Sequence, residues 1–309
     1  MAKFSINDFH GVIPALVTAF DLDGTLNEDL TRGLTASLLS RGVDGFYLTG
    51  STGEGFMMSP DERMRVVQVV CDEVAGRVPV MVHVGAISTY QTVALAQQAE
   101  AAGADAISSV PPIYWPFTPD QIVNYYTDVT ASTSLPMVAY NITLAGALGF
   151  DMLARLATIE GLKGVKYTAP THFEIGRMKR EIGPQFRVFS GADEMAMSGL
   201  AFGADGLIGS FYNIIPELYA DLTKAMAEGR LDDAKALQDK ANDIIFFTLQ
   251  QYPMSAVKRV MAWQGADAGY CRKPFDNYET PEQEAALKDA FRAFRDSHDL
   301  SGIGFLDGI

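Results

Sequence analysis

Short apolar stretches alternate along the chain with longer segments in which apolar residues recur at helical spacing. The apolar stretches are rich in β-branched and aromatic residues, and most of them lead into a polar loop. There are eight, beginning at Gly11, Val43, Val78, Ala104, Leu135, Leu162, Phe186 and Ala204. Eight strands alternating with eight helices predict an α/β fold of the (β/α)8 TIM barrel type rather than a doubly wound sheet.

Capping boxes mark the start of three predicted helices. The sequences SPDE at 59–62, TPDQ at 118–121 and TPEQ at 280–283 each place a hydroxyl residue before Pro and an acid or amide three residues later. The third belongs to helical patterns that continue beyond what a barrel needs. We therefore expect one domain over 1–309, with a barrel over about 8–225 and a C-terminal helical extension over about 226–309. The ending SGIGFLDGI gives no prediction.

Charge and hydropathy narrow the possible partners. A net charge of −14 argues against nucleic acid, because phosphate backbones are bound by clustered Lys and Arg. No apolar run approaches the roughly 20 residues of a spanning helix, and the N-terminus lacks the apolar core of a signal peptide, so we expect no membrane contact and a cytoplasmic location. Cys71 and Cys271 lie far apart and are interpreted as structural.

Chemistry in such a barrel lies at the carboxyl ends of the strands, so the polar residues there are the candidates. They are Thr49, Ser51, Thr52, His83, Tyr140, Asn141, Lys166, Thr168, Asp193, Glu194, Ser210 and Asn213.

Lys166 is the least expected of these residues, because it interrupts the apolar stretch LKGVKYT. Strand side chains alternate, so Lys166 and Thr168 share one face while Val165 and Tyr167 share the other. If Lys166 faces outward, it is a lysine that extends among the helices toward solvent. If it faces inward, burial disfavours the charged amine and supplies the neutral nucleophile that Schiff-base formation needs. The pattern alone leaves both open, and Lys163 at the strand start is a weaker candidate.

The other candidates also have structural explanations. Tyr140 is either a general acid and base beside Lys166 or a packed aromatic. The loop TGSTGEG at 49–55 is either an anion cradle or a tight turn, and it lacks the Lys of a P-loop. Asp193 and Glu194 are interpreted as polyol ligands or solvated charges, pointing apart on an extended segment. His83 is interpreted as a core histidine, and the four histidines show no metal-ligand spacing.

Four motifs together resemble the dihydrodipicolinate synthase/N-acetylneuraminate lyase family of pyruvate-dependent class I aldolases. They are GSTGEG at 50–55, YNI at 140–142, GVKYT at 164–168 and GADGLIGSFYN at 203–213. The likeness runs from Gly11 to about Phe275. It is greatest to the lyase branch, through YWPF at 114–117, GADE at 191–194 and CRKPF at 271–275.

The resemblance implies a role for each matching residue. Lys166 forms the imine with pyruvate, and Tyr140 transfers protons with Ser51 and Tyr114 as relay partners. Tyr114 reaches the site of an adjacent subunit, which implies a homotetramer, and Ser51 and Thr52 hold the carboxylate. The implied contacts to the sugar are Thr168, Gly191, Asp193, Glu194, Gly209 and Ser210. No cofactor and no metal are expected.

The implied reaction is the reversible cleavage of N-acetylneuraminate, a 2-keto sugar acid, to pyruvate and N-acetylmannosamine. The synthase branch carries an arginine five residues after the tyrosine, where this chain has Ala145, which argues against 4-hydroxy-tetrahydrodipicolinate synthase activity. The usual proline after YN-Ile/Val is Thr143 here. Because this loop borders the region beyond the pyruvyl group, an aldolase or dehydratase for another 2-keto-3-deoxy sugar acid stays an alternative.

Overall fold

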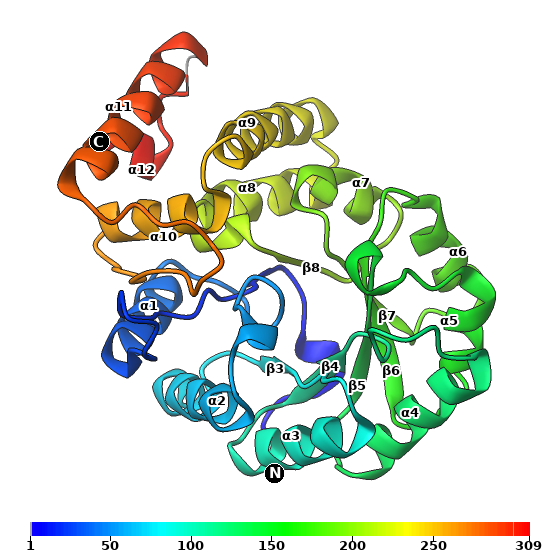
Figure 1. The fold of residues 1–309 in the computed structure, drawn as a ribbon. Helices are drawn as coiled ribbons and strands as arrows, with labels where there is room; N and C mark the ends of the chain where they lie inside the picture. Colours follow the sequence, from blue (N-terminus) through cyan, green and yellow to red (C-terminus); the bar gives the residue numbers. More distant parts are fainter. Residues whose placement is uncertain (1, 299) are drawn as a thin grey trace.

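The computed structural model describes residues 2–298 and 300–309, and its centre is a sheet of eight parallel strands. The order is β1-β8-β7-β6-β5-β4-β3-β2, and the sheet closes where Ala15 pairs with Tyr47. Figure 1 shows the strands surrounded by helices, as in a TIM barrel, so the predicted fold class is confirmed. The strands are β1 (Val12–Pro14), β2 (Phe46–Leu48), β3 (Val80–His83), β4 (Ala106–Ser109), β5 (Met137–Ile142), β6 (Leu162–Thr168), β7 (Arg187–Ser190) and β8 (Gly206–Gly209).

One helix follows each strand and covers the outside of the barrel. The capping boxes at Ser59 and Thr118 form as predicted, and each hydroxyl accepts the backbone N–H three residues on. The eight helices are α1 (Glu28–Ser40), α2 (Pro60–Val74), α3 (Thr89–Ala101), α4 (Pro119–Ala131), α5 (Phe150–Leu156), α6 (Phe173–Glu181), α7 (Ala196–Ala201) and α8 (Pro216–Ala227).

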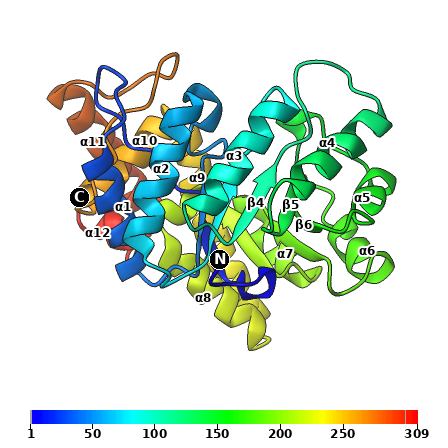
Figure 2. The same ribbon diagram turned by 90° about the horizontal axis from the view of Figure 1, so that it is seen from below.

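Four more helices pack on one side of the barrel, beside α1 and α8 (Figures 1 and 2). They are α9 (Leu231–Leu249), α10 (Pro253–Trp263), α11 (Pro281–His298) and α12 (Gly304–Asp307). The third capping box forms at the start of α11, where Thr280 and Gln283 exchange both bonds. The C-terminal segment at 301–309, which matched no predicted element, buries Phe305 and Leu306. None of the helices in the described part of the chain is long and apolar enough to span a membrane.

Buried residues form two layers. The larger lies between the strands and the helices that cover them. The smaller fills the inside of the barrel and consists of Phe9, Ile13, Ala15, Tyr47, Met81, Ala106, Val110, Val138, Tyr140, Phe189 and Ile208. Because neighbouring residues on a strand face opposite layers, membership of one layer identifies the direction of each side chain.

Candidate active site

Lys166 lies inside the barrel. Its backbone is in register with Tyr140 on β5 and with Phe189 on β7, and both of these belong to the inner layer. Val165 and Tyr167 belong to the outer layer, against the helices. Of the two orientations that the sequence pattern allowed, the structure has the inward one.

The side chain of Lys166 is enclosed by two aromatic rings. Its Nζ lies 4.3 Å from the ring centroid of Tyr47 and 4.3 Å from that of Tyr140, and the residue is only 4% exposed. Lys179 and Lys258 each pair with a carboxylate, whereas Lys166 has no ion pair among the residues described. An amine in this position is not neutralised by an acid, so its nitrogen is available to a ligand.

Tyr140 and two neighbours form an aromatic wall beside Lys166. The ring of Tyr140 packs edge-on against Tyr47 and against His83, with centroids 6.0 Å apart in both pairs. Burial lowers the pKa of His83 well below its ordinary value, and the nearby charges of Arg63 and Lys166 act in the same direction. His83 is therefore a neutral residue that accepts a bond from the backbone N–H of Val110, as expected for a core histidine.

Tyr47 is a site residue that the sequence analysis missed. It is 1% exposed, and burial, with Tyr140 as a second cause, raises its pKa well above the ordinary value, so it stays a neutral phenol. Its hydroxyl donates to Ser108 Oγ at 3.2 Å. The only signal in the sequence was an aromatic residue two positions before the Gly-rich loop.

The Gly-rich loop at 50–55 follows β2 at the same end of the barrel. Thr52 is buried, and its Oγ1 lies 2.6 Å from Ser210 Oγ, which joins this loop to the end of β8. Ser51 is exposed. The loop thus presents the exposed hydroxyl of Ser51, which has no partner in the described part of the chain, and the hydroxyl of Thr52, which is already paired.

Asp193 and Glu194 lie in different environments. The expected extended segment is instead a short 3₁₀ turn, Asp193–Met195, in which Asp193 is buried and Glu194 is exposed. The Oδ2 of Asp193 accepts from the backbone N–H of Phe211 at 2.7 Å, and burial raises its pKa to about 7. The description as solvated loop charges is wrong for Asp193, because the turn points it into the protein.

Two glycines have no room for a side chain at this end of the barrel. A Cβ on Gly209 would lie 1.7 Å from Asp193 Oδ1, and one on Gly191 would lie 2.0 Å from Thr168 Oγ1. The Oγ1 of Thr168 is itself buried and has no hydrogen-bond partner in the described part of the chain. A buried hydroxyl without a partner is uncommon, so this one is a candidate ligand contact.

Tyr114 is not brought to the other candidates within one chain. It is 84% exposed, has a positive φ of 85°, and packs edge-on against Trp115 with ring centroids 4.6 Å apart. A non-glycine residue with positive φ and an exposed aromatic side chain is a feature often found at functional surfaces.

The loop after β5 lies at the mouth of the barrel. The Asn141 side chain accepts from the backbone N–H of Leu148 at 2.7 Å and donates to its carbonyl at 3.1 Å, which folds the loop back. Ala145 packs against the inner layer, while Thr143 is exposed. Residue 145 therefore borders the interior that contains Lys166.

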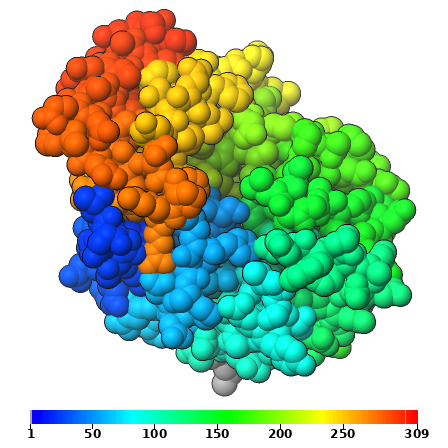
Figure 3. Space-filling view, viewed as in Figure 1, coloured from blue at the N-terminus to red at the C-terminus, as the bar shows by residue number. Residues whose placement is uncertain are grey.

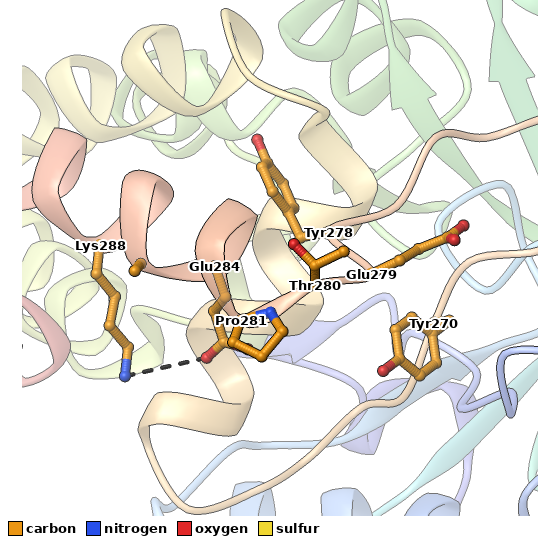
Figure 4. A pocket seen from close by; sticks show the side chains of 8 residues that line it. Tyr270, Tyr278, Glu279, Thr280, Pro281, Glu284 and Lys288 are labelled. Atoms are coloured by element: carbon orange, nitrogen blue, oxygen red, sulfur yellow. Dashed lines mark ion pairs between the residues drawn. The ribbon is translucent and has the colours of Figure 1, made fainter.

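A surface pocket of about 410 Å³ lies elsewhere, between the 270–280 segment and α11 (Figure 4). It is lined by Tyr270, Tyr278, Glu279, Thr280, Pro281, Glu284, Ala285 and Lys288, none of which is a predicted site residue. Within residues 2–298 and 300–309, no three side chains of His, Cys, Asp and Glu gather as metal ligands would.

Comparisons with known proteins agree on one family. The model of the Dihydrodipicolinate synthetase family matches residues 8–293. The N-acetylneuraminate lyase of Escherichia coli (strain SMS-3-5 / SECEC) is 36% identical over 285 residues, covering 90% of this chain and 96% of that protein. A Clostridium difficile protein solved in complex with mannosamine has a TM-score of 0.88 at 31% identity, covering 93% and 99% of the two chains. The catalytic lysine mutant of Ruminococcus gnavus sialic acid aldolase has a TM-score of 0.89 at 29% identity, covering 97% and 99%.

Proposed function

Because this chain belongs to the dihydrodipicolinate synthetase family, we propose that it is a class I aldolase that cleaves N-acetylneuraminate reversibly to pyruvate and N-acetylmannosamine. Its relatives are carbon–carbon lyases, and the chain is an enzyme of that kind. The observation that supports the Schiff-base chemistry most is the position of Lys166, buried between two aromatic rings and without an ion pair to any described carboxylate.

The first step is formation of an imine. The carboxylate of the 2-keto acid is held by the loop that carries Ser51 and Thr52, and Lys166 Nζ, after loss of its proton, attacks the ketone carbon. Loss of water gives a protonated imine, which withdraws electrons from the adjacent C3–C4 bond. Tyr47 and Tyr140 line this position, each with its ring centroid 4.3 Å from Lys166 Nζ.

The second step is carbon–carbon bond cleavage. Tyr140 accepts the proton of the C4 hydroxyl and passes its own phenol proton to the relay of Ser51 and Tyr114 while the C3–C4 bond breaks. The aldehyde leaves, and the electron pair of the broken bond forms an enamine on Lys166. Protonation of the enamine at C3 regenerates the imine, and hydrolysis releases pyruvate. The same steps in reverse condense pyruvate with the aldehyde.

The sugar portion of the substrate is assigned to the ends of β6, β7 and β8. Thr168 offers a buried hydroxyl that has no partner among the described residues, and Glu194 offers an exposed carboxylate from the turn that follows β7. Gly191 and Gly209 leave room for the neighbouring side chains, and their backbone groups are the proposed contacts to the sugar. Asp193 and Ser210 complete the set, and Asp193 acts mainly by holding the β8 end through Phe211.

We further propose a homotetramer in which the exposed Tyr114 completes the proton relay of a neighbouring subunit. Its 84% exposure and strained backbone fit a residue that finds its partner outside its own chain. Sedimentation analysis, together with loss of turnover but not of imine formation in Tyr114→Ala, tests this assignment.

A panel of substrates tests the proposed activity. Pyruvate release is measured with N-acetylneuraminate and with 2-keto-3-deoxygluconate, and condensation of pyruvate is measured with aspartate semialdehyde. We expect N-acetylneuraminate to give the highest kcat/KM and the semialdehyde to give no condensation. The second candidate, an aldolase for an unacetylated keto-deoxy sugar acid, is favoured by the exposed loop at 143–149, where Leu144 is 85% exposed. Faster turnover of 2-keto-3-deoxygluconate would establish it and overturn the first.

A further inference from the structure

The loop that carries Ser51 and Thr52 is anchored by a residue from the far end of the chain. Glu54, three residues after Ser51, is fully buried, and its Oε1 accepts from Lys258 Nζ at 2.6 Å. Lys258 lies on α10, in the helical extension, and its side chain is fully buried as well. The same ammonium donates to the carbonyls of Thr18 at 2.7 Å and Tyr270 at 2.6 Å. All three of its hydrogens are therefore used.

The second oxygen of Glu54 is held by the same part of the chain. Its Oε2 accepts from the backbone N–H of Arg272 at 2.7 Å. The Arg272 guanidinium in turn donates to Gly24 O at 2.9 Å and to Met57 O at 2.9 Å, and pairs with Glu62 at the start of α2. Figure 3 shows this segment, coloured orange, lying against the blue N-terminal part of the barrel.

The loop needs such an anchor because its backbone is strained. Glu54 has φ 54° and Thr49 has φ 53°, both in the left-handed region that residues with a side chain avoid. A conformation of this kind persists only where the surroundings hold it. Within the loop, Glu54 N–H donates to Ser51 O at 3.1 Å, so the position of Glu54 sets the turn that presents Ser51.

We propose that Lys258 and Glu54 are positioning residues for substrate binding, and that through them the helical extension holds the carboxylate cradle in its binding conformation. The inference rests on the proposed function, because it takes this loop to bind the carboxylate of pyruvate. Neither residue contacts the substrate, and both act through the backbone of residues 51–54. A fully buried charge pair is costly to desolvate, so a role beyond stability explains its presence better than stability does.

The chain offers a matched control at the opposite end of the barrel. Lys179 also donates to one carboxylate and two carbonyls, namely Asp205 at 2.8 Å, Pro184 O at 2.9 Å and Phe186 O at 3.1 Å. Asp205 precedes β8, at the amino end of the strands and away from the cradle. Lys179→Met therefore removes a lysine with the same pattern of hydrogen bonds from a place where no substrate is expected, although this lysine is less buried and Asp205 stays paired with Arg187.

The experiment measures imine formation as a function of pyruvate concentration, by borohydride trapping in the full-length protein. We expect Lys258→Met to raise the half-saturating pyruvate concentration by about 10-fold to 100-fold, with the trapped fraction at saturation unchanged, because Lys166 itself is not displaced. Lys179→Met should leave the half-saturating concentration at the wild-type value even if both variants melt at lower temperature.

The second variant, Glu54→Gln with Lys258→Met, removes both buried charges and so leaves no unpaired charge in the interior. It measures the effect of the anchor on the half-saturating pyruvate concentration if the single variant does not fold. Half-saturation equal to that of Lys179→Met in either variant would overturn the inference while leaving the aldolase intact. Absence of trapping in the wild-type protein would overturn the proposed function, and this inference with it.

Discussion

Replacement of Asp193 by Asn should stabilise the protein, and the gain should grow with pH. The carboxyl group of Asp193 is buried against the end of β8, and burial raises its pKa from 3.8 to about 7. The folded state therefore holds this proton more tightly than the unfolded state does. The contribution of this bound proton to the free energy of unfolding is fully present below about pH 4 and is lost as the pH rises toward 7. Asn keeps the size and an acceptor for Phe211 N–H without a titrating group.

The structure gives the size of the effect. A shift of about three pKa units at about 1.4 kcal/mol each corresponds to an upper limit of about 4 kcal/mol above neutral pH. Between about pH 5 and about pH 8.5 the free energy of unfolding of the variant, relative to wild type, should rise by about 3 kcal/mol. The variant should also turn over N-acetylneuraminate more slowly, because the proposed site uses this side chain.

Urea unfolding at several pH values, at one protein concentration, measures this difference. Gly33→Ala on α1 is the control, since it removes no titrating group and nothing lies within 4 Å of its new Cβ. The free energy of unfolding of this control, relative to wild type, should not change with pH. A pH-independent difference for Asp193→Asn would refute the conclusion that Asp193 is held in a pKa-raising environment.

Two further predictions concern the reaction. Gly191→Ala places a Cβ 2.0 Å from Thr168 Oγ1, so kcat/KM should fall by about 100-fold, whereas Gly33→Ala on α1, with nothing within 4 Å of its Cβ, should retain wild-type kinetics. Tyr140→Phe keeps the ring that packs against Tyr47 and removes the hydroxyl, so kcat for cleavage should fall by about 10²-fold to 10⁴-fold. Borohydride should still trap pyruvate in that variant, and unchanged kcat would exclude Tyr140 as the proton carrier.

The strand that carries Lys166 could be predicted from the sequence, but its orientation could not. The apolar stretch from Leu162 coincides with β6. Both faces of a barrel strand are buried. The apolar residues Val165 and Tyr167 on one face therefore do not show, by an alternation of apolar and polar positions, which face is turned to the interior. The family resemblance supplied the orientation that alternation alone could not.

Contacts between distant segments were beyond prediction. Glu54 and Lys258 are 204 positions apart, and each looked like an ordinary charge in its own segment. The single signal was a pair of adjacent charges, Lys258 and Arg259, in the otherwise apolar AVKRVMA of α10. The C-terminal helix α12 was missed because four residues are too few to show a helical period.

Covalent trapping tests the central claim most directly. The protein is treated with borohydride in the presence of pyruvate, and the modified peptide is located by mass spectrometry. The proposed mechanism predicts one pyruvate-dependent adduct, on Lys166, which is lost in Lys166→Met and retained in Lys163→Met. An unmodified Lys166, or an adduct on the exposed Lys163 of the same strand, would contradict it.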